Sequence, residues 1–378
     1  MRYSWSLLGA LIVLSCAPPP PPGTPPPPPP LKPLQVLDNR SFAFDVKFLA
    51  GDMVGCALME GGVYRLSVHD RRSGKRLKHV ALGPGQDWLH AMAVNKTAEL
   101  LAVGFRTLRK EQGRLIARGS VVLYNVPTGR QERSFTVPTP VRDLIWKDGS
   151  VFFVTEAQYV RRGEELRPRP GTAQVCRLSV KHGIRLCAAD HQDTVSSVAA
   201  LPDGGLVTGS WDRTVRVRKS LGDTKPAVLR TKGHVNALAA DQGHLLAVAT
   251  SHEKPRRSRK IVLREQRNEH RRTRRAGDAV ELWDLRSRQR LRSGQPHGAQ
   301  VTEVVMAPDG AVFATGSWDW TVAVFRRGFQ PPRSHLAVLR PFSQIVTGLD
   351  MHPASRTLAV AAWSEDRSGA PSCLLVRY

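Results

Sequence analysis

The chain has 378 residues, of which 41% are hydrophobic and 23% are charged, and its formal net charge is +24. This is the composition of a globular protein with enough apolar side chains for a large core, which excludes a mainly disordered or fibrous chain. The strongly basic balance favours an anionic partner over a cationic one.

Arginine supplies most of the positive charge, with 43 Arg against 13 Lys. Arg side chains match phosphate and carboxylate groups with paired hydrogen bonds, so a surface for anions is one explanation. A GC-rich genome, which favours Arg codons, is the other. The two differ in placement, because codon bias spreads Arg evenly whereas a binding face clusters it.

Residues 1–15 have the features of a bacterial signal peptide. Arg2 gives a positive start, and Leu7–Leu14 is apolar but too short to span a bilayer, which needs about 20 residues. The segment ends in Val13-Leu14-Ser15-Cys16, which resembles the lipobox of bacterial lipoproteins. The resemblance implies cleavage before Cys16 and a lipid on its thiol. A secretory signal with a chance cysteine is the alternative. By resemblance to enteric sorting rules, Ala17 after the cysteine favours the outer membrane.

Residues 16–33 follow as a lipidated cysteine and a proline-rich stalk, since 12 of the 28 prolines lie between Pro18 and Pro33. Such a run forms a polyproline II helix rather than an α-helix or a strand. At about 3.1 Å per residue the stalk would reach about 50 Å, enough to hold a domain away from the membrane. Docking into an aromatic groove of a partner is the alternative.

Residues 34–378 predict an all-β domain, because short segments rich in Val, Leu and Ala alternate with turns of Gly, Asp, Asn and Pro. Within it, Gly209–Val215 recurs almost letter for letter as Gly316–Val322, each beginning Gly-Ser-Trp-Asp. A His and a Pro-Asp-Gly turn precede both copies at matching distances, and Trp283-Asp284 repeats the dipeptide. A duplication of this kind indicates a fold built from repeated units.

These motifs resemble the WD-repeat β-propeller family, whose repeats exceed 40 residues. The resemblance implies an all-β, seven-bladed β-propeller of four-stranded antiparallel blades. The expected blades cover residues 41–86, 87–138, 139–190, 191–232, 233–296, 297–342 and 343–378. Leu374–Tyr378 aligns with a third strand and no fourth one follows it. We therefore expect the N-terminal strand Leu34–Leu37 to complete the last blade and close the ring.

The resemblance also implies a structural set of His, Ser or Thr, Asp and Trp that stiffens each blade. The corresponding side chains are His191, Thr208, Asp212, His297, Thr315, Asp319 and Trp283. Buried His–Asp pairs of this kind satisfy each other's hydrogen bonds, so we interpret them as structural rather than catalytic. The sequence departs from the family at Arg218 and Phe325, which replace Trp, and at Asp278, which lies one residue off the usual spacing.

The basic residues gather in three insertions between second and third strands, at 105–119, 155–172 and 251–277, whose net charge is about +13. By resemblance these loops meet on the narrower top face, where the family commonly binds its partners. The candidate binding residues are Arg106, Arg109, Arg114, Arg161, Arg162, Arg256, Arg257, Arg259, Arg271, Arg272, Arg274 and Arg275. The apolar run Lys260–Arg264 predicts a β-ribbon or a short helix, with a disordered charged arm as the alternative.

The cysteines raise a second question, about cross-links. Cys176 and Cys187 flank a turn symmetrically on neighbouring strands of blade three. In an oxidising compartment they would form a disulfide if their Cα atoms lie within about 7 Å; two small buried thiols are the alternative. Cys56 and Cys373 lack the His and Asn partners of a catalytic thiol.

The sequence predicts no enzyme, no cofactor and no metal site. It contains no Gly-rich phosphate loop, HExxH motif or paired CxxC motif, and its twelve His show no metal-ligand spacing. The leading interpretation is a scaffold, lipid-anchored in the bacterial cell envelope, that binds an acidic protein partner. The alternatives are a binder of lipid phosphate, acidic glycan or nucleic acid and, less favoured, a propeller enzyme with a small-molecule substrate. Nucleic acid is disfavoured, because the insertions offer only Phe105 and Tyr159 for stacking.

Overall fold

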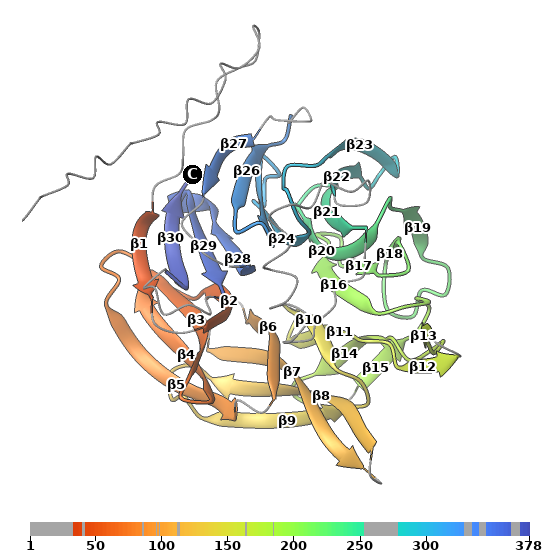
Figure 1. Cartoon of the computed structure of the whole chain (residues 1–378), viewed down its shortest axis with the longest axis horizontal. Coiled ribbons are helices and arrows are strands. Elements are labelled where there is room, and N and C mark those ends of the chain that lie inside the picture. Colours follow the sequence, from red (N-terminus) through yellow and green to blue (C-terminus); the bar gives the residue numbers. More distant parts are fainter. Residues whose placement is uncertain are drawn as a thin grey trace, which may run out of the picture.

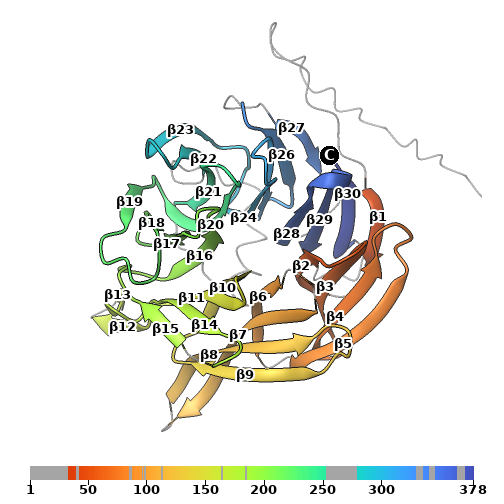
Figure 2. The same ribbon diagram turned by 180° about the vertical axis from the view of Figure 1, so that it is seen from behind.

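Seven four-stranded antiparallel sheets stand around a central axis as the blades of a β-propeller (Figure 1). The computed structural model describes residues 33–39, 42–84, 87–95, 97, 99–111, 114–162, 165–183, 185–252, 279–328, 335–339, 345–363 and 371–378. Each predicted blade contains one of the sheets, so the predicted fold and the repeat register are confirmed. Figures 1 and 2 view the ring from opposite sides, and in both the first strand of every blade lies nearest the axis.

The strands of the first three blades follow one another in sequence order from the axis outwards. Blade one contains β2 (Phe42–Phe48), β3 (Met53–Glu60), β4 (Val63–Asp70) and β5 (Arg76–Pro84). Blade two contains β6 (Trp88–Val94), β7 (Leu100–Glu111), β8 (Arg114–Asn125) and β9 (Gln131–Val137). Blade three contains β10 (Val141–Lys147), β11 (Ser150–Thr155), β14 (Val175–Ser179) and β15 (Arg185–Ala188). A separate hairpin, β12 (Tyr159–Arg162) and β13 (Glu165–Pro168), leaves blade three between β11 and β14.

The other four blades have the same arrangement. Blade four contains β16 (Val195–Ala200), β17 (Leu206–Ser210), β18 (Thr214–Arg218) and β19 (Ala227–Arg230). Blade five contains β20 (His234–Ala240), β21 (Leu245–Ser251), β22 (Ala279–Asp284) and β23 (Gln289–Gly294). Blade six contains β24 (Val301–Met306), β25 (Val312–Ser317), β26 (Val322–Arg326) and β27 (His335–Leu339). Blade seven contains β28 (Val346–His352), β29 (Thr357–Ala362), β30 (Cys373–Arg377) and β1 (Pro33–Asp38), with a short 3-10 turn at Pro353–Ser355.

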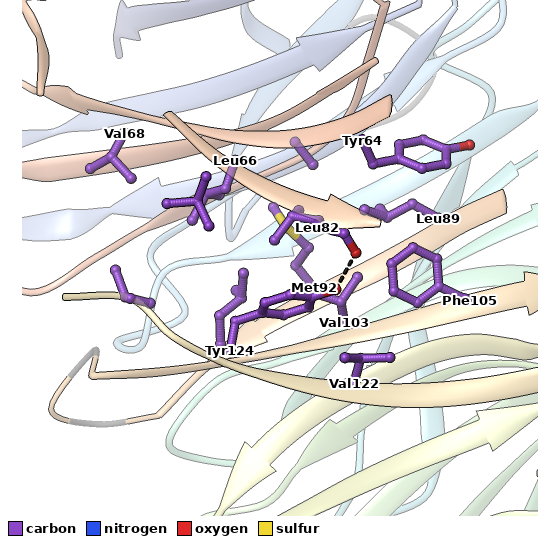
Figure 3. Close-up of a cluster of buried hydrophobic side chains, with 14 of the residues drawn as sticks. Tyr64, Leu66, Val68, Leu82, Leu89, Met92, Val103, Phe105, Val122 and Tyr124 are labelled. Carbon is purple, nitrogen blue, oxygen red and sulfur yellow. Dashed lines mark hydrogen bonds between the residues drawn. The ribbon is translucent and has the colours of Figure 1, made fainter. Parts of the chain in front are cut away.

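The hydrophobic core lies between neighbouring blades. Second strands such as β17 and β29 are buried at every residue, whereas most of the outer strand β9 is exposed. Figure 3 shows one interface, where Leu66 and Val68 of blade one pack against Met92 and Val103 of blade two. Each blade therefore buries both faces of its sheet, and no blade has a core of its own.

The ring closes as expected, because β1 pairs with β30 and places Val36 opposite Leu374. The predicted closing strand Leu34–Leu37 is confirmed and extends one residue further at each end. The sequence did not predict that a disulfide joins Cys56 of β3 to Cys373 of β30. These residues lie 317 positions apart and become neighbours only because blade one meets blade seven. A second disulfide joins Cys176 to Cys187, which face each other across β14 and β15, so the structure has the cross-link rather than two thiols.

Every inner strand begins with the same irregularity, a shift in register after its first paired residues. In four blades the residue at this bulge donates a side-chain hydrogen bond to a backbone oxygen of the next blade. The bonds are Ser196 to Val235 (2.6 Å), Asn236 to Val301 (2.7 Å), Thr302 to Val346 (2.9 Å) and Thr347 to Ala43 (2.9 Å). Blades one, two and three carry Phe44, His90 and Arg142 at the same place. The bulge residue therefore links a blade to the next one by a hydrogen bond in blades four to seven, and it is a different kind of side chain in blades one to three.

The three basic insertions differ in structure. The first is a β-ribbon, since β7 and β8 stay paired as far as Glu111 and Arg114. The second forms the hairpin β12–β13. Most of the third lies outside the described residues, as do Lys260–Arg264, Asp278, the predicted signal peptide, Cys16 and the stalk. In the described part of the chain, no helix is long and apolar enough to cross a membrane.

Candidate functional site at the mouth of the propeller

The predicted structural side chains of blade four lie together within the blade. Nδ1 of His191 is 3.0 Å from an oxygen of Asp212, and Nε2 is 3.0 Å from the hydroxyl of Thr208. Burial lowers the pKa of His191, so the ring is neutral and Nδ1 donates to the carboxylate. Burial alone would raise the pKa of Asp212, but hydrogen bonds from His191 and Thr214 outweigh it and hold that pKa well below its usual range. The group is internally satisfied, as a structural role requires.

Blade six repeats this arrangement, except that Nδ1 of its His lies closer to a Thr hydroxyl than to the Asp carboxylate. Nε2 of His297 is 2.7 Å from the hydroxyl of Thr315, while Nδ1 is 2.8 Å from Thr321 and 3.3 Å from Asp319. Burial opposes ionisation of Asp319, but the hydrogen bond with His297 and other donors lower its pKa to about 2. Phe325, in the Trp position, stacks on Phe313 with ring centroids 4.9 Å apart.

Blades four and five replace parts of the set with charged groups whose pairing the sequence did not predict. Arg218 is fully buried, and its Nη2 lies 3.1 Å from both carboxylate oxygens of Asp190. Arg216 approaches the same carboxylate at 3.2 Å. In blade five the indole of Trp283 donates to Glu281 at 3.0 Å, and that carboxylate is completely buried. Arg218 and Asp190 are visible in the sequence at the two ends of the repeat, but only the fold shows that their side chains meet.

Lowering the pH should weaken the hydrogen-bonded sets of His, Thr and Asp in blades four and six. We expect Asp319→Asn to lower the free energy of unfolding by about 2 kcal/mol at pH 7, because about two pKa units separate the folded from the unfolded carboxyl. The folded pKa is the lower one, so this contribution is complete above pH ~4 and disappears towards pH ~2. Denaturant unfolding at pH 7 and at pH 3 measures the change. The control Asp309→Asn alters an exposed carboxyl in the same blade. A difference between Asp319→Asn and wild type that stays constant with pH would contradict the assignment.

The duplicated tryptophans lie at one end of the ring, where the inner strands begin, and this end is called the mouth below. Each follows a second strand, and its backbone N–H donates to the residue just before the neighbouring inner strand. Trp211 bonds to Thr194, Trp318 to Gln300 and Trp363 to Ile345, at 2.9 to 3.0 Å. Glu156 makes the same bond to Pro140 in blade three. Trp363 is thus a third copy of the motif position, although its surrounding sequence has diverged.

Three indoles line a pocket of about 120 Å³ at the mouth, between blades six, seven, one and two. This mouth pocket is bordered by Phe44, Trp88, Leu89, His90, Thr302, Glu303, Trp318, Ile345, Val346, Thr347 and Trp363. The ring centroids of Phe44 and Trp363 are 6.2 Å apart. Nε1 of Trp363 is buried and makes no hydrogen bond with the described residues. The lining of the pocket therefore combines flat apolar surfaces with the buried indole N–H of Trp363.

Alternating charges and indoles extend from the mouth pocket across blades two to four. The guanidinium of Arg106 lies 6.0 Å from the ring centre of Trp88 and 3.9 Å from Glu156. Arg142 is 3.1 Å from the same carboxylate and lies 4.9 Å from the ring centre of Trp211. One carboxylate thus holds two guanidinium groups beside two indoles, an arrangement stabilised by ion pairing and cation–π attraction.

The predicted binding arginines are only partly brought together. Arg106 lies 6.0 Å from the ring centre of Trp88, which lines the mouth pocket, whereas Arg109 is exposed on the β7–β8 ribbon and Arg161 on the β12–β13 hairpin. Arg114 and Arg162 lie in strands whose side chains at these positions are outside the described residues, as are all the predicted arginines from 256 to 275. Exposed basic side chains also occur on outer strands, at Arg76, Arg185, Arg230 and Arg292. Charge alone therefore does not mark the site. The sequence prediction considered aromatic residues only inside the insertions and so did not include the three tryptophans of the mouth pocket.

Comparison with known proteins bears on the repeat. The family model "WD domain, G-beta repeat" matches residues 185–218 and 288–326. Each match begins on the outer strand of one blade and continues through three strands of the next, so one sequence repeat links two blades. No curated protein matches the chain. Among the described residues, no group of His, Cys, Asp or Glu is arranged to hold a metal ion.

Proposed function

We propose that this chain, with WD repeats in a seven-bladed propeller, is a lipid-anchored scaffold that binds an acidic protein segment at its mouth. Propellers with such repeats are commonly scaffolds for protein interaction. The observation that carries the proposal is the mouth pocket, where Trp88, Trp318 and Trp363 surround one small space beside Arg106. Rigid aromatic side chains at the centre of an interface supply most of the binding energy in protein complexes.

The chemistry of the pocket indicates how a partner would bind. The indoles favour an apolar anchor side chain, and Nε1 of Trp363 can donate to a carbonyl or carboxylate of the bound segment. Arg106 lies half-buried at the edge, beside the exposed basic ribbon that continues towards Arg109. A segment with an apolar residue flanked by Asp or Glu would satisfy both features, because opposite charges complement each other across interfaces.

The anchor is the part of the proposal that rests on sequence alone. The lipobox-like segment ending at Cys16 would place a lipid at the start of the mature chain, with the outer membrane favoured. The proline stalk would then separate the propeller from the bilayer by up to about 50 Å. That distance would leave the mouth accessible to other envelope proteins.

Cross-linking and affinity capture from the native envelope test the proposal. We expect Trp318→Ala to reduce capture of the partner at least 10-fold, because hot-spot truncations commonly cost 2 kcal/mol or more. The matched control is Trp320→Ala, two residues away in the same turn but outside the pocket lining. Capture by wild type should also weaken between about 0.15 and 1 M salt, since screening shortens from about 8 to 3 Å.

Two results would contradict the scaffold proposal. One is an equal loss of capture in both tryptophan variants while circular dichroism shows that both are folded. The other is capture that does not change with salt, which would exclude an acidic partner. Membrane fractionation of the same cells tests the anchor. Cys16→Ser should release the protein from the membrane, and retention of this variant in the membrane fraction would exclude the lipid anchor.

A further inference from the structure

A second pocket lies on the side of the propeller, between blade one and the basic ribbon of blade two. Its volume is about 190 Å³, and its lining includes Thr107, Arg109, Arg118, Ser120, Ser134 and Thr136. From this lining we infer a binding site for a phosphorylated polyol or sugar, a site that goes beyond the scaffold function. It lies apart from the mouth pocket and shares no lining residue with it.

The register of blade two explains why these side chains share one face. Thr107 of β7 pairs with Arg118 of β8, and Phe105 pairs with Ser120 one row further in. Ser120 in turn pairs with Thr136 of β9, and Val122 pairs with Ser134. Directly opposed residues lie on the same face about 5 Å apart, and residues two apart on a strand also share a face. The outer rows therefore present hydroxyl and guanidinium groups together.

The floor of the pocket is apolar and firmly held. Figure 3 shows Leu82, Phe105, Val122 and Tyr124 in the core between blades one and two, where the hydroxyl of Tyr124 donates to the Leu82 carbonyl. Burial and the charge of Asp87 raise the pKa of Tyr124 to about 12, so the phenol stays neutral and keeps this bond. A rigid floor of this kind positions the polar rows above it.

The hydroxyl groups of the pocket are available to a ligand. The side chains of Thr107, Ser120, Ser134 and Thr136 make no hydrogen bond within the described part of the chain, although other polar side chains line the same pocket. Each hydroxyl can donate to an anionic oxygen. Four hydroxyls beside the guanidinium of Arg109 suit a phosphate better than a carboxylate, because a phosphate has more oxygens and a charge near −2. The rows of hydroxyl groups thus match the several acceptor oxygens of a phosphate.

Asp87 completes the description of the ligand. Its carboxylate lines the same pocket and would repel a bare anion placed against it. It can instead accept hydrogen bonds from hydroxyl groups. A ligand with a phosphate towards Arg109 and Arg118 and hydroxyls towards Asp87 satisfies both ends. Glycerol phosphate and sugar phosphates have this chemistry, either as soluble molecules or as lipid headgroups.

Calorimetric titration of the full chain in neutral detergent micelles tests the site, with glycerol 3-phosphate, inorganic phosphate and glycerol as probes. We expect glycerol 3-phosphate to bind more tightly than phosphate, and glycerol not to bind. Arg118→Ala should weaken binding at least 10-fold, and the uncharged double variant Ser120→Ala/Thr136→Val about 3- to 10-fold. The control Arg130→Ala removes the same charge from an exposed side chain in the turn between β8 and β9 and should change binding less than 2-fold.

Three results would overturn the inference. These are no binding of glycerol 3-phosphate up to about 1 mM, equal weakening by Arg118→Ala and Arg130→Ala, and full binding by the hydroxyl variant. The last two would indicate a general basic surface. Adding phosphatidylglycerol to the micelles then distinguishes the source. If phosphatidylglycerol displaces glycerol 3-phosphate, the site is assigned to a lipid headgroup. If it displaces no more than the control lipid phosphatidylcholine does, the site is assigned to a soluble phosphate. None of these measurements depends on the protein partner at the mouth.

Discussion

Removing the disulfide between Cys56 and Cys373, as Cys56→Ala/Cys373→Ala, is expected to lower the free energy of unfolding by about 5 kcal/mol. The two sulfurs close a loop of 317 residues, and a cross-link restricts the unfolded chain more as the loop grows. Both cysteines are completely buried where blade one meets blade seven. The native packing of the closure can then remain while the unfolded chain gains freedom.

The second disulfide provides the control. Cys176→Ala/Cys187→Ala removes the same chemistry from a separation of only 11 residues and should cost about 3 kcal/mol. Guanidinium unfolding of oxidised wild type and both double variants measures the two losses. If the Cys176/Cys187 variant lost as much as the other or more, stabilisation through ring closure would be wrong.

Asp190→Ala is expected to cost about 3–5 kcal/mol, because it leaves the buried guanidinium of Arg218 without a counter-charge. Arg218 is among the largest fully buried side chains of the protein, and Arg216 points at the same carboxylate. Burial alone would raise the pKa of Asp190, but Arg218 and Arg216 outweigh it and lower that pKa. The carboxylate is therefore ionised at neutral pH and holds two positive charges in place.

Removing both charges should be far less harmful than removing one. The double variant Asp190→Ala/Arg218→Phe places an aromatic ring where blade six has Phe325, opposite Leu206, and should recover most of the loss. Urea unfolding of the two single variants and the double variant gives the coupling energy. A loss below about 1 kcal/mol in Asp190→Ala would show that solvent already screens this pair.

Much of the fold could be predicted because the repeat carries its own register. Two well-kept copies at Trp211 and Trp318 showed where strands and turns fall, and weaker blades followed by spacing. The closing strand could be predicted by counting, since the last blade had only three strands after residue 343. The Cys56–Cys373 pair could not, because its proximity is a property of the closed ring and not of any local segment.

The candidate sites were harder to predict, for a physical reason. Residues that meet at the mouth come from the starts of different inner strands, for example Phe44, Trp88 and Thr302, and no spacing in the sequence connects them. The motif tryptophans were visible but were interpreted as repeat markers. The lateral pocket depended on two strands of an insertion remaining paired, which composition alone does not indicate. Charge counts pointed to the ribbon of blade two without distinguishing its two faces.

The position of β1 has a mechanical consequence. Any force transmitted along the chain before residue 33 reaches the propeller at β1, whose hydrogen bonds to β30 carry the load first. Without a cross-link, pulling β1 away would leave blade one and blade seven joined by packing and by hydrogen bonds such as that from Thr347 to Ala43. The Cys56–Cys373 bond makes the chain from one blade round to the other a covalent loop. A propeller pulled from before residue 33 can therefore lose its closing strand under tension and still remain a ring, ready for β1 to pair again when the tension falls.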